Sequence, residues 1–68
     1  MLWEKIYEKL SEKNWTIYKL ALTAGVDPAT IYRLRDGKVN DLYFETVKKI
    51  ADALEVSLDE FRKKGENR

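Results

Sequence analysis

The sequence predicts a single all-α domain over residues 1–68, built from five helices. Apolar residues recur at steps of three and four along the chain, which is the spacing of one helix face. Three of the expected helices begin with the same local pattern, a polar cap residue between two apolar positions. No stretch alternates between apolar and polar residues as a half-buried strand would. A chain of 68 residues has room for one such domain.

The first helix is expected over residues 2–13, because apolar side chains recur there at steps of four. Its apolar face consists of Leu2, Ile6 and Leu10. The second helix is expected over residues 17–24. Thr16 precedes this helix and can act as its N-cap, since its hydroxyl can accept a hydrogen bond from one of the first unpaired amides.

The third helix is expected over residues 28–36, with Ile31 and Leu34 on its apolar face. Asp27 is the expected N-cap. Pro28 then occupies the first helical position, where a missing amide hydrogen removes no helix bond. Gly37 is expected to end the helix, because glycine adopts a left-handed conformation at low cost.

A fourth helix is expected over residues 44–54 and a fifth over residues 58–64. The apolar face of the fourth consists of Phe44, Val47, Ile50, Ala51 and Leu54. Ser57 and Glu60 have the spacing of a capping box at the start of the fifth helix. Three apolar pairs have the spacing of hydrophobic staples, which fix the angle at which the chain enters a helix. They are Trp15 with Leu20, Val26 with Ile31, and Val56 with Phe61.

The amino-acid composition argues against enzymes and metal-binding proteins. The chain has no Cys, so neither a disulfide nor a thiolate metal site can form. The absence of His removes the commonest zinc ligand and the commonest general base. We therefore expect no metal, no cofactor and no enzymatic activity. The start "MLWEKIYEKL" lacks the pattern of a signal peptide, and no apolar run approaches the ~20 residues of a membrane span, so a cytoplasmic protein is expected.

The second and third expected helices are separated only by a short turn containing Gly25. Two helices joined by such a turn form a helix-turn-helix. Gly25 can supply the left-handed backbone angle of the turn, and Ala21 is small enough to let the next helix approach closely. An ordinary helical hairpin in a small bundle is the alternative.

The segment "TIYKLALTAGVDPATIYRLRDGK" followed by "FETVKKIADALEVSLDEF" resembles the Cro and lambda-repressor type of helix-turn-helix regulators. In that family an Ala in the second helix, a Gly in the turn, and an Ile followed by Ile or Leu in the third helix recur. Here these residues are Ala21, Gly25, Ile31 and Leu34. The resemblance covers nearly the whole chain. It implies a five-helix, lambda-repressor-like DNA-binding domain whose third helix enters the major groove.

The chain departs from the family at four positions. Ile17 and Pro28 stand where many members have Gln residues that contact phosphates and bases. Arg35 stands where the family often has Glu, and no basic partner for such a Glu is evident in the first helix. Glu55 replaces the usual Gly after the fourth helix.

The face of the third helix opposite Ile31 and Leu34 is the expected base-reading surface. Arg33 is its strongest candidate, because a guanidinium can bind O6 and N7 of guanine, although it can also be a solvated cation. Ala29 can contact a thymine methyl. Tyr32 can touch a base edge or a phosphate, or pack on a neighbouring helix. The expected base-reading set is Pro28, Ala29, Tyr32, Arg33 and Asp36.

Polar residues at the edges of this surface are expected to contact phosphates. The expected phosphate-contacting set is Thr16, Tyr18, Thr30, Lys38 and Asn40. Asp27 is expected to serve as a cap. Asp36 is expected to point aside or to accept from a cytosine amine, because phosphates would repel it. Arg35 is expected to pair with a carboxylate of the first helix.

These observations predict a regulator that binds double-stranded DNA sequence-specifically, of a repressor type similar to those of phages or mobile elements. Two alternatives stay open: an antitoxin-like autoregulator, and a protein-binding adaptor that keeps the fold without binding DNA. The net charge of +1 and the missing Gln residues favour the adaptor, whereas Arg33 and Lys38 favour DNA binding.

A homodimer on a pseudo-palindromic operator is expected, because one recognition helix reads too few base pairs for useful specificity. The pair can form in solution or only on DNA. The fifth helix, with Leu58 and Phe61, and the region of Trp3 are candidate contacts, unless these side chains belong to the core or are incidental surface.

Overall fold

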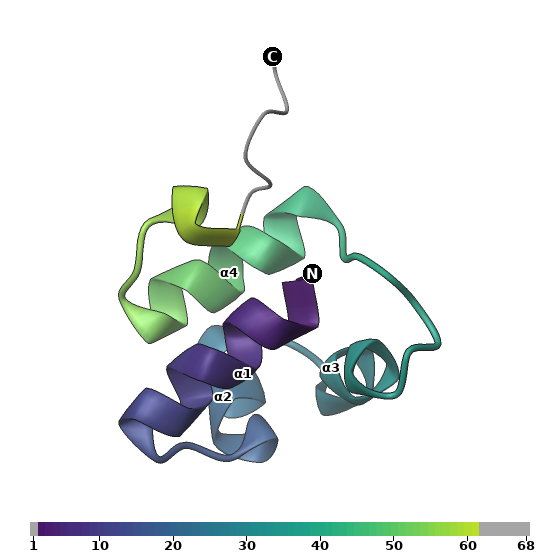
Figure 1. The fold of residues 1–68 in the computed structure, drawn as a ribbon, viewed down its shortest axis with the longest axis horizontal. Coiled ribbons are helices and arrows are strands. Elements are labelled where there is room, and N and C mark those ends of the chain that lie inside the picture. The colour runs from purple at the N-terminus through teal and green to yellow at the C-terminus, as the bar shows by residue number, and fades with distance from the viewer. Residues whose placement is uncertain (1, 62–68) are drawn as a thin grey trace.

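The computed structural model describes residues 2–61, which form four α-helices and one 3₁₀ helix with no strand among them (Figure 1). The helices are α1 (Leu2–Lys13), α2 (Ile17–Ala24), α3 (Pro28–Arg35), α4 (Phe44–Leu54) and the 3₁₀ helix η1 (Leu58–Phe61). The all-α prediction is confirmed, and α3 ends one residue earlier than expected. Within the described part of the chain, every helix is too short or too polar to cross a bilayer.

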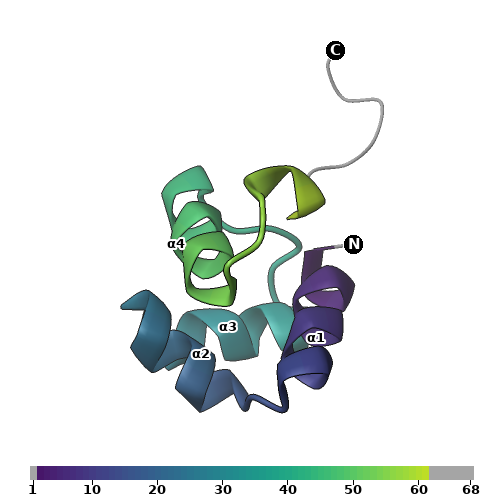
Figure 2. The ribbon, with the colours of Figure 1, turned by 90° about the vertical axis from the view of Figure 1, so that its left-hand side faces the viewer.

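The helices pack around one hydrophobic core. α2 packs against both α3 and α4, and η1 packs against α4 and α1. Figure 2 shows η1 bridging the space between α4 and α1, which places the C-terminal end of the described chain beside its beginning. The buried apolar residues are Leu2, Ile6, Leu10, Leu20, Ala21, Ile31, Leu34, Val47, Ile50, Ala51, Leu54 and Phe61. Phe44, expected on the apolar face of α4, is instead 65% exposed, because the buried face of this helix begins one turn later, at Val47.

Three helix starts are capped by the predicted side chains. The side-chain oxygen accepts a hydrogen bond from a first-turn amide at 3.0 Å for Thr16, 2.9 Å for Asp27 and 3.2 Å for Ser57. Each bond satisfies an amide that has no partner within its helix. The local sequence was therefore sufficient to predict where these three helices begin.

The fifth element differs from its prediction. It is a single 3₁₀ turn over Leu58–Phe61, and the expected continuation over residues 62–64 lies outside the described residues. The capping box is not formed, because Glu60 pairs with Lys9 of α1 at 2.9 Å instead of reaching back to Ser57. This hydrogen bond raises the pKa of Lys9 above its ordinary value. Tertiary contacts to the core and to α1 hold this short element in place.

All four α-helices end in the same way. A left-handed residue follows each helix: Asn14 (φ 58°), Gly25 (φ 73°) and Glu55 (φ 60°) come directly after α1, α2 and α4, and Gly37 (φ 77°) comes one residue later, after Asp36, for α3. The next amide then bonds to a carbonyl five residues back, as in the Schellman motif; in α4 the amide of Val56 donates to the carbonyl of Ala51 at 3.0 Å. Two of these four positions are not glycine, and a side chain there strains the backbone.

Replacing Glu55 with glycine is expected to raise the free energy of unfolding by about 1 kcal/mol, because glycine adopts the left-handed angle without a Cβ clash. Chemical denaturation of the variant and the parent measures this change. Glu55→Ala is the matched control, since it removes the carboxylate but keeps the Cβ. If the glycine and alanine variants are equally stable, backbone strain at residue 55 is not the cause.

Candidate nucleic-acid interface

The turn between α2 and α3 is built by Gly25. Its amide donates to the carbonyls of Ala21 at 2.9 Å and Leu22 at 3.3 Å, and the Val26 amide donates to the same Ala21 carbonyl at 3.0 Å. Ala21 is only 1% exposed, and α2 packs directly against α3. The small side chain and the left-handed glycine thus allow two eight-residue helices to cross closely, as a helix-turn-helix requires.

The two faces of α3 differ in chemistry. Ile31 and Leu34 are 0% and 4% exposed and anchor the helix in the core. Ala29 and Arg33 lie on the exposed side. Among residues 2–61 the Arg33 guanidinium has no hydrogen-bond or ion-pair partner. This cation is therefore available to a ligand outside the protein.

The other arginine of α3 is engaged within the protein. Nε of Arg35 donates to Oδ1 of Asp36 at 2.8 Å, and Nη2 donates to Oδ2 at 3.3 Å. The guanidinium carbon of Arg35 lies 4.9 Å from the centre of the Tyr32 ring. Asp36, Arg35 and Tyr32 therefore form one connected group at the C-terminal end of α3, which we call the Tyr32 stack.

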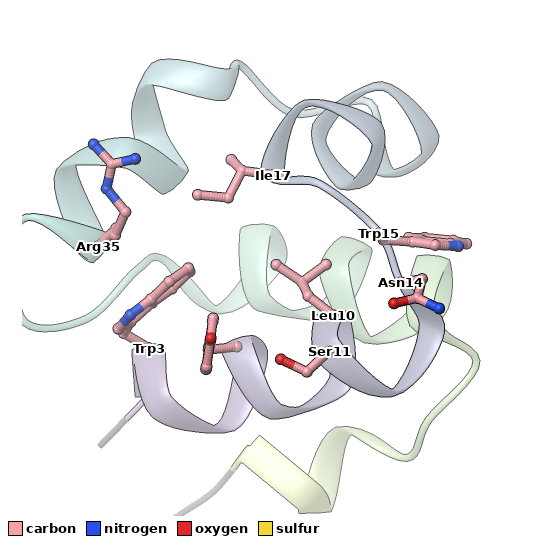
Figure 3. Close-up of a pocket in the computed structure, with 8 residues that line it drawn as sticks. Trp3, Leu10, Ser11, Asn14, Trp15, Ile17 and Arg35 are labelled. Atoms are coloured by element: carbon pink, nitrogen blue, oxygen red, sulfur yellow. The ribbon is translucent and has the colours of Figure 1, made fainter.

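The expected pairing of Arg35 with a carboxylate of α1 is wrong. Arg35 and α1 face each other across an open groove of about 370 Å³, with Trp3, Leu10 and Ser11 on the α1 side (Figure 3). The α1 residues that line this groove carry no carboxylate. Asp36 is the next residue in the chain, and its two carboxylate oxygens accept from Nε and Nη2 on one edge of the guanidinium, so it takes the place of a partner on α1.

The ion pair with Arg35 keeps the carboxyl of Asp36 in its charged form. Asp36 was one of the expected base-reading residues. The hydrogen bond from Arg35 lowers the pKa of the Asp36 carboxyl below its ordinary value, and it raises the pKa of Arg35. Both groups are consequently ionised at neutral pH. The adjacent guanidinium compensates the carboxylate, so repulsion between Asp36 and a nearby phosphate is weaker than the isolated side chain would suggest.

A second group of cations surrounds the start of α2. Nζ of Lys13 lies 5.5 Å from the centre of the Trp15 ring, and Nζ of Lys19 lies 5.2 Å from it. Thr16 caps the helix between them. A helix N-terminus also carries a partial positive charge. Sequence reasoning named Thr16 as a phosphate contact and Lys19 as a weaker candidate, but it did not group Lys13 and Lys19 around Trp15, although two lysines near one tryptophan at a helix start were a visible signal.

The remaining predicted site residues lie on three consecutive segments. Tyr18 in the first turn of α2 is 57% exposed. On α3, Pro28 occupies the first helical position and Thr30 is half-buried. Lys38 and Asn40 are exposed in the loop after α3, which swings around the edge of the molecule to reach α4 (Figure 1). Within residues 2–61 no three acidic, Cys or His residues cluster in a way that could hold a metal ion.

Comparisons with known proteins agree with this geometry. The fold is similar to the N-terminal DNA-binding domain of SinR from Bacillus subtilis, with a TM-score of 0.84, 22% sequence identity and 97% coverage of each chain. A comparison with curated protein sequences found no match. The family model of the Cro/C1-type helix-turn-helix DNA-binding domain matches residues 5–63. Because that match spans most of the chain, the protein belongs to the Cro/C1-type helix-turn-helix DNA-binding domain family.

Proposed function

We propose that this domain binds double-stranded DNA sequence-specifically as a small transcriptional repressor, with α3 in the major groove. One observation carries the proposal. Arg33 is exposed on the side of α3 opposite the buried Ile31 and Leu34, and no group among residues 2–61 occupies its guanidinium. An arginine in the major groove can bind O6 and N7 of guanine with two hydrogen bonds, which is the commonest specific contact to a base.

The neighbouring residues suit the edges of such a complex. Thr16 accepts from the Lys19 amide, and a hydroxyl can still donate its own hydrogen to a phosphate oxygen. Lys13 and Lys19 lie beside it against Trp15, so two ammonium groups flank the positive end of α2. Lys38 is exposed in the loop that follows the C-terminal end of α3. We assign these residues to phosphate contacts, which orient the domain without reading sequence.

Binding to DNA across a range of salt concentrations tests this function. For a DNA-binding domain, log K should fall linearly with log salt, with a slope of about −0.9 for each phosphate neutralised. Selection from a random duplex library should then enrich a defined site, whereas single-stranded DNA of the enriched sequence should bind more weakly. If affinity for duplex does not depend on salt and no site is enriched, the protein is an adaptor that retains the fold, acting through protein partners.

The domain is further proposed to act as a symmetric pair on DNA. One α3 reads too few base pairs, so two copies should bind half-sites whose centres lie about 34–36 Å apart. Phe61 is only 7% exposed and Leu58 packs on the core, which favours the alternative that these two side chains belong to the core. Tyr43 and Phe44 are 88% and 65% exposed and are better candidates for the contact.

The selected site and the stoichiometry of the complex check the symmetric pair. We expect a pseudo-palindrome bound by two chains, as measured by native mass spectrometry. Moving one half-site by about half a helical turn, roughly five base pairs, should abolish cooperative binding, because it places the second half-site on the opposite side of the duplex. A selected site without a dyad, bound by one chain per duplex, would contradict the pair.

A further inference from the structure

The Tyr32 stack combines two contacts that are individually common on helix surfaces. Tyr32 and Arg35 are three residues apart on α3, so their side chains lie on the same side of the helix. The 4.9 Å between the guanidinium carbon and the ring centre is within the range of cation–π contacts. The two hydrogen bonds to Asp36 hold the guanidinium in one plane. The guanidinium of Arg35 is thus hydrogen-bonded to Asp36 and also contacts the ring of Tyr32.

The consequence for Tyr32 is a restricted ring. The side chain is half-buried, and its hydroxyl has no hydrogen-bond partner among residues 2–61. A tyrosine that is ordered before binding loses less conformational entropy when it contacts a ligand. The unoccupied hydroxyl can donate to or accept from a base edge. Arg33 differs from Arg35, because the Arg33 guanidinium has no partner among residues 2–61, whereas the Arg35 guanidinium contacts both Asp36 and Tyr32.

We infer that Arg35 is a positioning residue for base recognition: held by Asp36, it stacks on Tyr32 and fixes the ring in the orientation in which its hydroxyl meets a base edge. This inference rests on the proposed function. It assigns Arg35 no contact with DNA of its own. It also gives Asp36 a role inside the protein, as the anchor of Arg35, in place of a role as a base reader.

A test in the free protein examines the stack itself. The Hδ protons of Arg35 should be shifted upfield by the ring current of Tyr32 in NMR spectra, and the shift should persist in Tyr32→Phe, which keeps the ring. Tyr32→Leu should abolish the shift. Asp36→Asn should reduce it, because the bidentate anchor is lost. A shift that is absent from the parent protein, or unchanged in Tyr32→Leu, would overturn the inference without any measurement on DNA.

A second test measures recognition by a double-mutant cycle of Tyr32→Phe and Arg35→Gln. Both single variants should flatten the preference at the same base pair of the selected site, Arg35→Gln by about 2- to 5-fold, which corresponds to an exposed cation–π contact. The double variant should lose no more preference there than Tyr32→Phe alone. Arg35→Lys should restore only part of the preference, because an ammonium lacks the planar fork.

Lys38→Gln is the matched control, since it removes a nearby cation that contacts no ring within residues 2–61. If Arg35→Gln behaves like this control, weakening preferred and scrambled duplexes by one common factor, Arg35 contacts phosphate and the inference is overturned. Additive effects in the cycle would overturn it as well. A parent protein that binds no duplex would refute the proposed function itself, and a parent that selects a site but shows no coupling would refute the positioning role alone.

Discussion

Replacing Ile31 with alanine is expected to lower the free energy of unfolding by about 2–5 kcal/mol. Ile31 is 0% exposed at the centre of the core, so truncation removes its buried methyl groups and leaves a cavity. A domain this small has a total stability near the lower end of about 5–15 kcal/mol, so much of its folded population can be lost. Denaturation in urea, followed by circular dichroism at 222 nm, measures the change.

The control for Ile31→Ala is Leu22→Ala on α2. Leu22 is 62% exposed, and its truncation leaves no enclosed cavity. Its effect should be within about 0.5 kcal/mol, as for most surface substitutions. Equal losses at Leu22 and Ile31 would mean that α3 is not anchored through its inner face as described.

Replacing Arg33 with alanine is expected to cost about 1–3 kcal/mol of binding free energy at the selected site and to relax the choice at one base pair. The loss arises because two hydrogen bonds to a base disappear while the fold keeps its core. Titration with the preferred duplex and with a scrambled duplex measures the change in binding. The melting temperature of the variant protein shows whether its stability has changed as well. The scrambled duplex should lose much less affinity.

Lys38→Ala is the matched comparison for Arg33→Ala. It removes one exposed cation next to the same helix, and it should weaken all sequences alike and make the salt dependence shallower, because a phosphate contact carries no base information. The melting temperature of both variants should change only by the small amount that is usual for a surface substitution. If Arg33→Ala leaves base preference untouched, then the exposed face of α3 does not read DNA, and the adaptor function takes precedence.

The parts of the fold that depend on local chemistry were predictable from the sequence. The caps at Thr16, Asp27 and Ser57 act within three residues of their own position, and the bounds of α1, α2 and α4 agree with the apolar spacing. The fifth element was mispredicted because its form depends on distant partners. Glu60 has the local signature of a capping box, but its carboxylate forms an ion pair with Lys9 of α1, which is distant in the sequence.

The candidate site was predictable at the level of the surface but not of individual side-chain partners. Ala29 and Arg33 lie on the exposed side of α3 because the 3.6-residue period fixes the side of the helix that they occupy. The partner of Arg35 depends on which α1 side chains face it, and periodicity does not specify which face of α1 meets α3. Those side chains include Trp3 and Ser11, so the ion pair forms with Asp36 instead.

The connections between helices differ in how freely their length can change. The links at 14–16, 25–27 and 55–57 each contain a left-handed residue that stops one helix and a side-chain cap that starts the next. Inserting or deleting one residue there would change the fixed spacing between the left-handed residue and the cap, or remove one of them. The loop at 36–43 is longer, and α4 begins at its end without a side-chain cap bond. Evolutionary change in chain length is therefore easiest in the loop that directly follows the proposed reading helix, where added residues would alter the binding surface and leave the core intact.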